Sequence, residues 1–133
     1  MSGSSAPDAF DRRVTTLFTP MLRESPEPRW ARLRKRLGDE RIDPRDAAIG
    51  TLFPDDGSME FGIVVSRDGR AFAFDFDFLR DPDGNRIQSR SDARVVNFKP
   101  LDTEQLEFTY SRAIRAALWF LTSEDVGPGQ DEP

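Results

Sequence analysis

The sequence predicts an α+β fold built as one domain: two N-terminal helices, a four-stranded antiparallel β-meander, and a C-terminal helix packed on one face of the sheet. Apolar residues recur at helical spacing near both ends of the chain, whereas short aromatic and β-branched runs separated by turn residues fill its middle. The 133 residues are enough to bury a single core. We expect residues 1–5 to be disordered, residues 6–122 to form the domain, and residues 123–133 to be a disordered acidic tail.

Two helices are expected in the first third of the chain. The first covers about residues 7–19, and Pro20 should end or kink it, because an internal proline removes a helical hydrogen bond. The second covers about residues 27–37, with Pro28 near its start and Gly38 beyond its end, where these residue types usually stand around a helix.

A β-hairpin is the strongest local prediction. Residues 58–66 and 71–79 flank Asp68-Gly69, a dipeptide preferred at the centre of a two-residue type I′ turn. Closing the hairpin at this turn pairs Ile63 with Phe74, and we expect both side chains to be buried. The same register places the following apolar residues on one face: Met59, Phe61, Ile63, Val65, Phe72, Phe74, Phe76 and Phe78.

Two further strands complete the meander. A strand over about residues 48–53 precedes the hairpin, and its register stays open, since either Leu52 or Phe53 can face the core. A strand over about residues 93–98 follows the hairpin and stops at Pro100, because proline cannot donate to a sheet ladder.

The C-terminal helix has a capping residue and a continuous apolar stripe. Asp102 or Thr103 caps it, and the helical period continues to about Thr122. The stripe is wide enough to cover the phenylalanine face of the hairpin, so we expect the helix to pack there.

Three acids gather on the other face of the predicted hairpin. In this register Glu60 faces Asp77, with Asp75 on the diagonal, and facing like charges destabilise a sheet. Local conflicts of this kind tend to mark functional sites, so the three acids are a candidate partner-binding surface. Two alternatives remain: the acids hold Mg²⁺ or Mn²⁺ through their oxygens, or an arginine neutralises them, namely Arg94, Arg112 or Arg115.

The second helix offers another candidate surface. Arg29, Arg32 and Arg36 share one helical face, which could contact nucleic acid or an acidic partner. The alternative is a solvated face whose arginines pair with nearby acids such as Asp39 and Glu40.

The composition excludes several function classes. The chain has no His and no Cys, which rules out disulfides, thiolate or imidazole metal sites and a Ser-His-Asp triad. We therefore expect no catalytic residues and no cofactor; a metal site would have to use Glu60, Asp75 and Asp77. The net charge of −5 disfavours binding to nucleic acid or to acidic membranes.

Location and origin also leave traces in the sequence. It contains no run of about 18 apolar residues, and its N-terminus lacks the basic and apolar regions of a secretory signal, so we expect a cytoplasmic protein. Lys35 and Lys99 are the only lysines among 19 basic residues, an arginine bias typical of GC-rich bacterial genes.

These observations together indicate a small acidic cytosolic protein–protein interaction module, of chaperone, adaptor or inhibitor type, with no intrinsic catalysis. The alternative is a carboxylate-dependent metal enzyme, or a small-molecule-binding domain, that uses the sheet face with Glu60, Asp75 and Asp77. The expected partner is another protein, a basic one being an option because the chain is acidic. A homodimer stays open.

Overall fold

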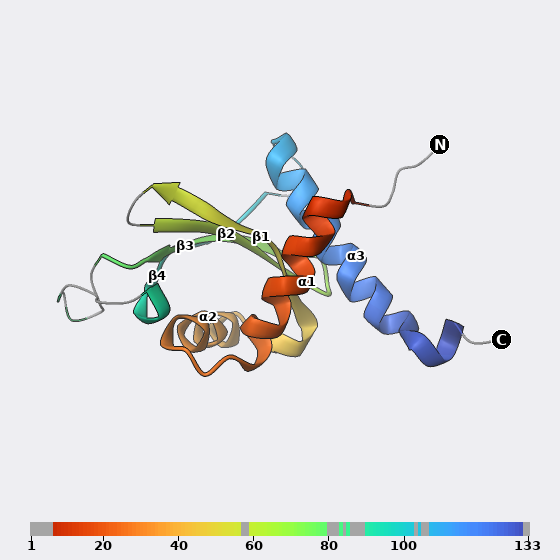
Figure 1. The fold of residues 1–133 in the computed structure, drawn as a ribbon, viewed down its shortest axis with the longest axis horizontal. Helices are drawn as coiled ribbons and strands as arrows, with labels where there is room; N and C mark the ends of the chain where they lie inside the picture. Colours follow the sequence, from red (N-terminus) through yellow and green to blue (C-terminus); the bar gives the residue numbers. More distant parts are fainter. Residues whose placement is uncertain are drawn as a thin grey trace.

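The computed structural model describes residues 7–56, 59–79, 83, 85, 90–102, 104 and 107–131, and it gives only the backbone of residues 55, 56 and 126–131. The segment 1–5, expected to be disordered, lies outside these residues. Figure 1 shows the elements, whose bounds are α1 (Ala9–Glu24), α2 (Pro28–Asp39), the 3-10 helix η1 (Pro44–Asp46), β1 (Ala47–Asp56), β2 (Met59–Ser66), β3 (Ala71–Asp77), the 3-10 helix η2 (Arg90–Asp92), β4 (Arg94–Pro100) and α3 (Phe108–Asp131).

The chain has the predicted α+β architecture, and helices pack on both faces of one antiparallel sheet. The strand order is β1-β2-β3-β4, so each strand pairs with the next along the chain. α2 and the last turns of α1 pack on one face, whereas α3 packs on the other, where it contacts β1 and β2. In Figure 1, α2 lies below the sheet and α1 crosses in front of α3, with which it is in contact.

α1 begins at a capped N-terminus and runs through a proline. The Asp8 carboxylate accepts a hydrogen bond from the Asp11 N–H at 2.9 Å, which caps the first turn. The sequence predicts that the helix ends or kinks at Pro20; the predicted end is wrong, because α1 continues to Glu24. Leu22 in the last turn is fully buried in the core, and this burial offsets the hydrogen bond lost at Pro20.

α2 starts at Pro28 as expected and extends two residues beyond its predicted end, to Asp39. Gly38 lies inside the last turn rather than after it. The left-handed residue beyond the helix is instead Arg41, with φ 62°. The buried side of the helix consists of Trp30, Leu33 and Leu37.

The hairpin forms where predicted, but its register differs by one residue. The Ser66 N–H donates to the Arg70 carbonyl at 2.8 Å, which leaves three residues in the loop. Gly69 is left-handed, with φ 95°, and a three-residue loop with a left-handed glycine is the next commonest hairpin connection after the two-residue turn. Ile63 therefore pairs with Ala73 instead of Phe74. The predicted burial of both Ile63 and Phe74 is confirmed; their predicted pairing is wrong.

A shift of one residue moves every side chain of one strand to the opposite face. The phenylalanines of β3 therefore share a core with α1 and α2, in a cluster that includes Trp30, Val64, Phe72, Phe74 and Phe76. The core under α3 is separate and is formed by Ala48, Ile63, Val65, Ala71, Ala113, Ala117 and Leu121. The prediction that the C-terminal helix covers the phenylalanine face is thus wrong.

The edge strands settle two further expectations. In β1, Leu52 is buried and Phe53 is 40% exposed, which resolves the register that the sequence leaves open. β4 ends at Pro100, as predicted. The strand contains a bulge: Ala73 pairs with Lys99 but Asp75 pairs with Val96, so the register of β3 and β4 shifts between them. Asn97 lies in this bulge and has a φ of 56°.

α3 begins and ends later than the sequence predicts. Its first residue is Phe108 rather than a residue next to Asp102, and it continues through Ser123 to Asp131. The segment 123–131, expected to belong to a disordered tail, is therefore helical. Glu124 and Asp125, at the start of this segment, contact Arg23 of α1 and Arg67 of the hairpin loop. The composition of the segment does not predict these contacts. Within the described residues, no helix is long and apolar enough to cross a bilayer.

Candidate functional site

The observed register separates the three acids that the sequence places together. Glu60 pairs with Phe76 and so lies on the face covered by α2. Its carboxylate accepts a hydrogen bond from Arg29 at 2.7 Å and lies 3.5 Å from Arg90, and its side chain is only 12% exposed. Glu60 is therefore an internal ion-pair partner that helps to hold α2 on the sheet.

Asp75 and Asp77 lie on the opposite face, and both have internal partners. Asp77 Oδ2 accepts hydrogen bonds from the Arg94 guanidinium at 3.0 and 3.2 Å, and the side chain is 8% exposed. Asp75 Oδ2 accepts a hydrogen bond from Asn97 Nδ2 at 2.8 Å. Of the three arginines considered as neutralising partners, Arg94 thus takes that role for Asp77.

A metal site formed by all three acids does not fit this geometry, because Glu60 and the two aspartates are on opposite faces of the sheet. Among the described residues, no group of three or more acidic side chains is placed to hold one metal ion.

The arginines of the predicted basic surface also make contacts within the chain. Arg29 lies 5.2 Å from the ring centres of Trp30 and Phe76, in addition to its ion pair with Glu60. Arg32 donates to the carbonyl of Ala93 at 3.0 Å and to that of Asp92. Arg36 stacks over Phe98 at 4.8 Å. All three arginines attach α2 to the sheet and η2, and each is half-buried.

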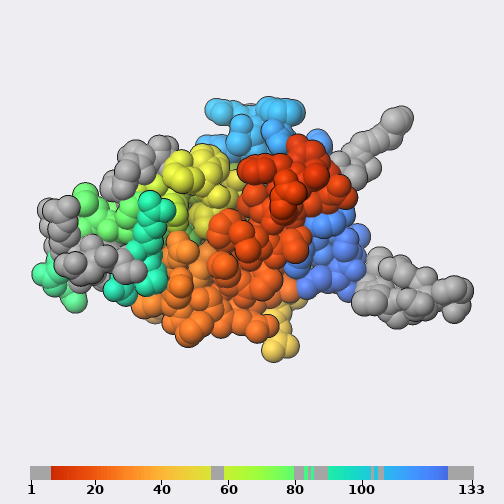
Figure 2. Space-filling model, in the orientation of Figure 1, coloured from red at the N-terminus to blue at the C-terminus, as the bar shows by residue number. Residues whose placement is uncertain are grey.

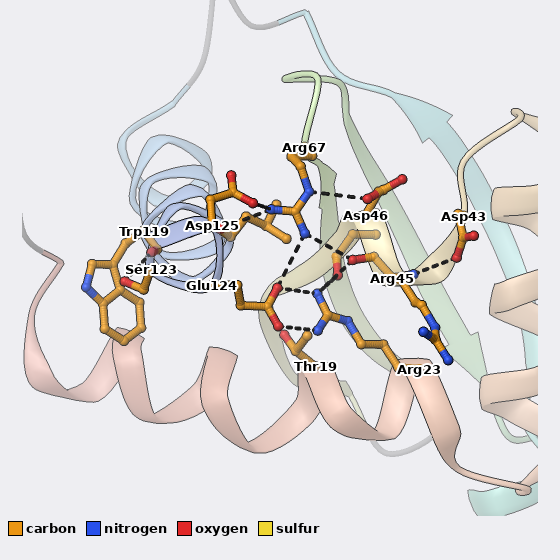
Figure 3. Close-up of polar contacts among 12 residues, drawn as sticks. Thr19, Arg23, Asp43, Arg45, Asp46, Arg67, Trp119, Ser123, Glu124 and Asp125 are labelled. Atoms are coloured by element: carbon orange, nitrogen blue, oxygen red, sulfur yellow. Dashed lines mark hydrogen bonds and ion pairs between the residues drawn. The ribbon is translucent and has the colours of Figure 1, made fainter. Parts of the chain in front are cut away.

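A network of ion pairs joins α1, α3 and the hairpin loop (Figure 3). Arg23 of α1 donates to Glu124 of α3 at 2.8 Å, and to the carbonyls of Arg45 and Ala47 at 3.1 and 3.2 Å. Arg67 of the loop is held in the same region by the carboxylates of Asp46 and Asp125 and the carbonyls of Arg45 and Leu121.

The network changes the ionisation of its members. The hydrogen bond from Arg23 lowers the pKa of Glu124 below its ordinary value, although burial acts in the opposite direction. Burial also acts to lower the pKa of Arg67, but the hydrogen bonds to Asp125 and Asp46 together raise it. A pocket of about 480 Å³ lies beside these groups. Since Arg23 and Arg67, which line it, already hold carboxylates, we interpret the network as structural.

A group of exposed aromatic side chains lies at the other end of α1. We call Phe10, Phe53 and Phe108 the aromatic patch; their exposed fractions are 63%, 40% and 73%. They come from α1, β1 and α3. A pocket of about 180 Å³ lies among these elements and is lined by Phe10, Phe53, Thr109 and Arg112, among others. In Figure 2, the starts of α1 (red) and α3 (light blue) lie side by side on the surface.

Arg112 lies within the aromatic patch in a fixed position. Its guanidinium donates to Asp11 at 3.0 and 3.1 Å and to Asp8 at 2.8 Å. It also lies 5.6 Å from the ring centre of Phe108. Leu17, which is 55% exposed, extends the apolar surface along the outer face of α1.

A third pocket lies on the α3 face of the sheet, next to the start of α3. We call it the sheet pocket; its volume is about 260 Å³. The rings of Phe61 and Tyr110 stack at 5.8 Å and form one wall. The polar lining residues are Asp75, Asn97 and Lys99.

The sequence identified one member of these two surfaces, Asp75, as a candidate site residue. Phe10 and Leu17 recur at helical spacing with other apolar residues, and such a period does not say which side of a wide stripe meets the sheet and which stays exposed. In the sequence, the signal for the sheet pocket was Asp75 on the third strand. Lys99 and Tyr110 could not be assigned to the same pocket, because their places in it depend on the observed register and on the position of α3. In comparisons with family models, curated proteins and solved structures, the chain matches none of them.

Proposed function

We propose that this protein is a protein–protein interaction module that binds its partner through the aromatic patch. The main observation is that Phe10, Phe53 and Phe108, from three separate elements, expose 63%, 40% and 73% of their surface. Phe10 and Phe53 line one pocket together with Arg112, whose guanidinium lies 5.6 Å from the ring centre of Phe108. Single exposed apolar residues are ordinary, but a contiguous group of large ones is typical of a contact surface.

The composition of the patch resembles the energetic centre of an interface. Aromatic residues and arginine are the side chains most enriched among interface positions that carry binding energy. Here Arg112 is held by Asp8 and Asp11, so it can present its remaining surface with little loss of side-chain entropy. The supporting elements are two helices and a strand, which give the patch a rigid base.

The surroundings of the patch indicate the chemistry of the partner. Asp8 has a side chain that is 57% exposed, and Glu104 and Glu107 just before α3 are exposed as well. The whole chain carries a net charge of −5. A protein surface with an apolar side chain at its centre and basic residues around it would be complementary to the patch in shape and charge. No catalytic step is part of this proposal.

A site-specific photo-cross-linker tests the proposal in cells of the source organism. A benzophenone amino acid replaces Phe108 in one variant and Leu79 in the control; Leu79 is also exposed, at 43%, but lies after β3. We expect one discrete protein adduct from position 108 that the control does not give and that Phe10→Ala removes. Equal adducts at both positions, or no adduct at position 108, would contradict the proposal.

A further inference from the structure

We propose that the sheet pocket binds a small zwitterion of the α-amino acid class with an aromatic or apolar side chain. This inference concerns a surface other than the aromatic patch and does not depend on the proposed partner. Its basis is that one pocket of about 260 Å³ combines a carboxylate, an ammonium group and an aromatic wall. Small-ligand sites are commonly apolar pockets in which a few polar groups converge.

Asp75 supplies the carboxylate and has unused acceptor capacity. Its Oδ2 accepts one hydrogen bond from Asn97, whereas its Oδ1 is buried and accepts none from any described group. Buried acceptors without a partner are rare in proteins, so Oδ1 calls for a donor that the chain itself does not provide. The ammonium group of a ligand is such a donor, and a small movement of the Asn97 side chain would admit it.

The backbone at Asn97 has the features of a functional position. Asn97 is left-handed, with φ 56°, in the bulge of β4. Bulges often redirect a side chain next to a site, and residues in sparsely populated backbone conformations gather at ligand sites. Here the Asn97 amide in the bulge donates to Asp75, which holds the carboxylate in the lining of the pocket.

Lys99 supplies the opposite charge. It pairs with Ala73 across the sheet, so it lies on the same face as Asp75. It is exposed and forms no ion pair with an acid in the described part of the chain. Two opposite charges that line one pocket without pairing with each other match a ligand that carries both charges, with its ammonium group toward Asp75 and its carboxylate toward Lys99.

The wall of the pocket selects the rest of the ligand. The rings of Phe61 and Tyr110 stack at an interplanar angle of 21°, and Phe74 and Phe98 also line the pocket, so an apolar side chain can pack against aromatic rings there. Tyr110 also carries a hydroxyl group that can donate or accept at the rim. An amino acid with a flat apolar side chain therefore matches the Asp75 carboxylate, the Lys99 ammonium group and the aromatic wall of the pocket.

NMR titration of the full chain tests this with three probes that share a phenyl ring and differ in the charged groups they carry: L-phenylalanine has both, phenethylamine only the ammonium group, and 3-phenylpropionate only the carboxylate. The amide signals of Ala73, Asn97 and Lys99 report on the pocket. We expect saturable shifts with L-phenylalanine at millimolar concentrations, and roughly tenfold weaker binding of each singly charged probe, since each lacks one charge-assisted contact. No saturable shift with any probe would overturn the proposal.

Two variants assign the contacts. Lys99→Gln should weaken L-phenylalanine and 3-phenylpropionate but not phenethylamine, and Asp75→Asn should weaken L-phenylalanine and phenethylamine but not 3-phenylpropionate. Lys35→Gln, which changes the other lysine on the exposed side of α2, is the matched control and should have no effect. Because Lys99 is exposed, its variant should fold even if Asp75→Asn does not. Equal affinity of all three probes for wild type and Lys99→Gln would show binding elsewhere and contradict the proposal.

Discussion

At the scale of single residues, the role of each acid depends on the cation that reaches it. The side chain of Asp77 is 8% exposed. Its carboxylate accepts two hydrogen bonds from Arg94 and one from the Leu79 N–H, the last at 3.0 Å. Asp77→Asn would leave the Arg94 guanidinium without its counter-charge, so we expect a loss of about 1–3 kcal/mol in the free energy of unfolding. Denaturant melts at low and high salt would measure it.

Salt separates this buried pair from an exposed one. Because salt screens exposed charges far more than buried ones, the loss in Asp77→Asn should persist at high salt. Asp39→Asn is the control: Asp39 is 57% exposed and lies 4.0 Å from Lys35, so its variant should change stability little. If Asp77→Asn stabilised the protein at low salt, the acid would not be structural.

Gly62 and Gly38 differ in how closely other atoms approach them, so we expect substitutions at the two positions to have different effects. A Cβ at Gly62 would overlap the ring of Phe74, which is buried in the core, whereas a Cβ at Gly38 would meet no atom within 4 Å. Gly62→Ala should therefore cost about 1–3 kcal/mol through overpacking. Gly38→Ala, inside α2, should leave stability unchanged or raise it by up to about 1 kcal/mol. The urea midpoint should thus fall for Gly62→Ala and stay unchanged or rise for Gly38→Ala. A lower midpoint in both variants would refute the packing argument.

At the scale of elements, the hairpin shows what a sequence can and cannot predict. Both strands and the loop position were predictable from alternation and Asp68-Gly69. The register was not, because a two-residue turn and a three-residue loop both suit this dipeptide. The alternation of apolar and polar residues along a strand fixes the register only when one face of the sheet is buried and the other is exposed. In this sheet Ile63 and Val64, which point to opposite faces, are both fully buried, so either register looks apolar.

The attachment of α3 to α1 depends on an acid whose ionisation changes with pH. Since the pKa of Glu124 is lowered in the folded chain, the unfolded chain takes up the proton first as the pH falls. The stabilisation is therefore present above the ordinary glutamate value of about 4.5 and is lost below it. We expect Glu124→Gln to be less stable than wild type near neutral pH, by less than about 1 kcal/mol because the pair is partly exposed.

Thermal melts across the acid range measure this difference. The gap between wild type and Glu124→Gln should narrow as the pH falls below the ordinary glutamate value, where the unfolded chain takes up the proton. It should close below the lowered pKa of folded Glu124, where the folded wild-type carboxylate is protonated too. Glu107→Gln, an exposed glutamate just before α3, should follow wild type throughout. A gap of constant size at every pH would mean that the variant acts through packing instead.

Two truncations test the same attachment without changing a side chain. Removal of residues 127–133 keeps Glu124 and Asp125, which form ion pairs with Arg23 and Arg67. Removal of residues 123–133 deletes both. We expect the longer protein to melt as wild type does and the shorter one to melt at a lower temperature. Equal melting temperatures would show that these ion pairs contribute nothing, as exposed pairs often do not.

At the scale of the whole molecule, helices that pack on both faces of the sheet explain where the sequence-based prediction of the site fails. The elements and their order follow from local patterns, but the face that each helix covers depends on the hairpin register. A shift of one residue moved Glu60 away from Asp75 and placed α3 on the face of Ile63. As a result, Glu60 and Asp77 pair with different arginines, and the exposed apolar residues lie where the outer side of α1 meets α3.

The same arrangement predicts that residues for folding and residues for binding can be separated. Phe10 and Phe108 are mostly exposed, so replacing both by Ser removes little buried area and should leave the free energy of unfolding nearly unchanged. Phe74 is 1% exposed, so Phe74→Ala should cost about 3–5 kcal/mol. Urea denaturation compares the variants. The second readout is the adduct formed when the benzophenone amino acid replaces Thr109, an exposed residue that lines the same pocket, in the wild-type and double-variant backgrounds. If the double variant lost several kcal/mol, the patch would belong to the core in solution; if it stayed stable and kept the adduct, binding would use another surface. A stable protein that no longer forms the adduct is the expected result, because a contiguous group of exposed aromatic residues is typical of a surface that a partner covers.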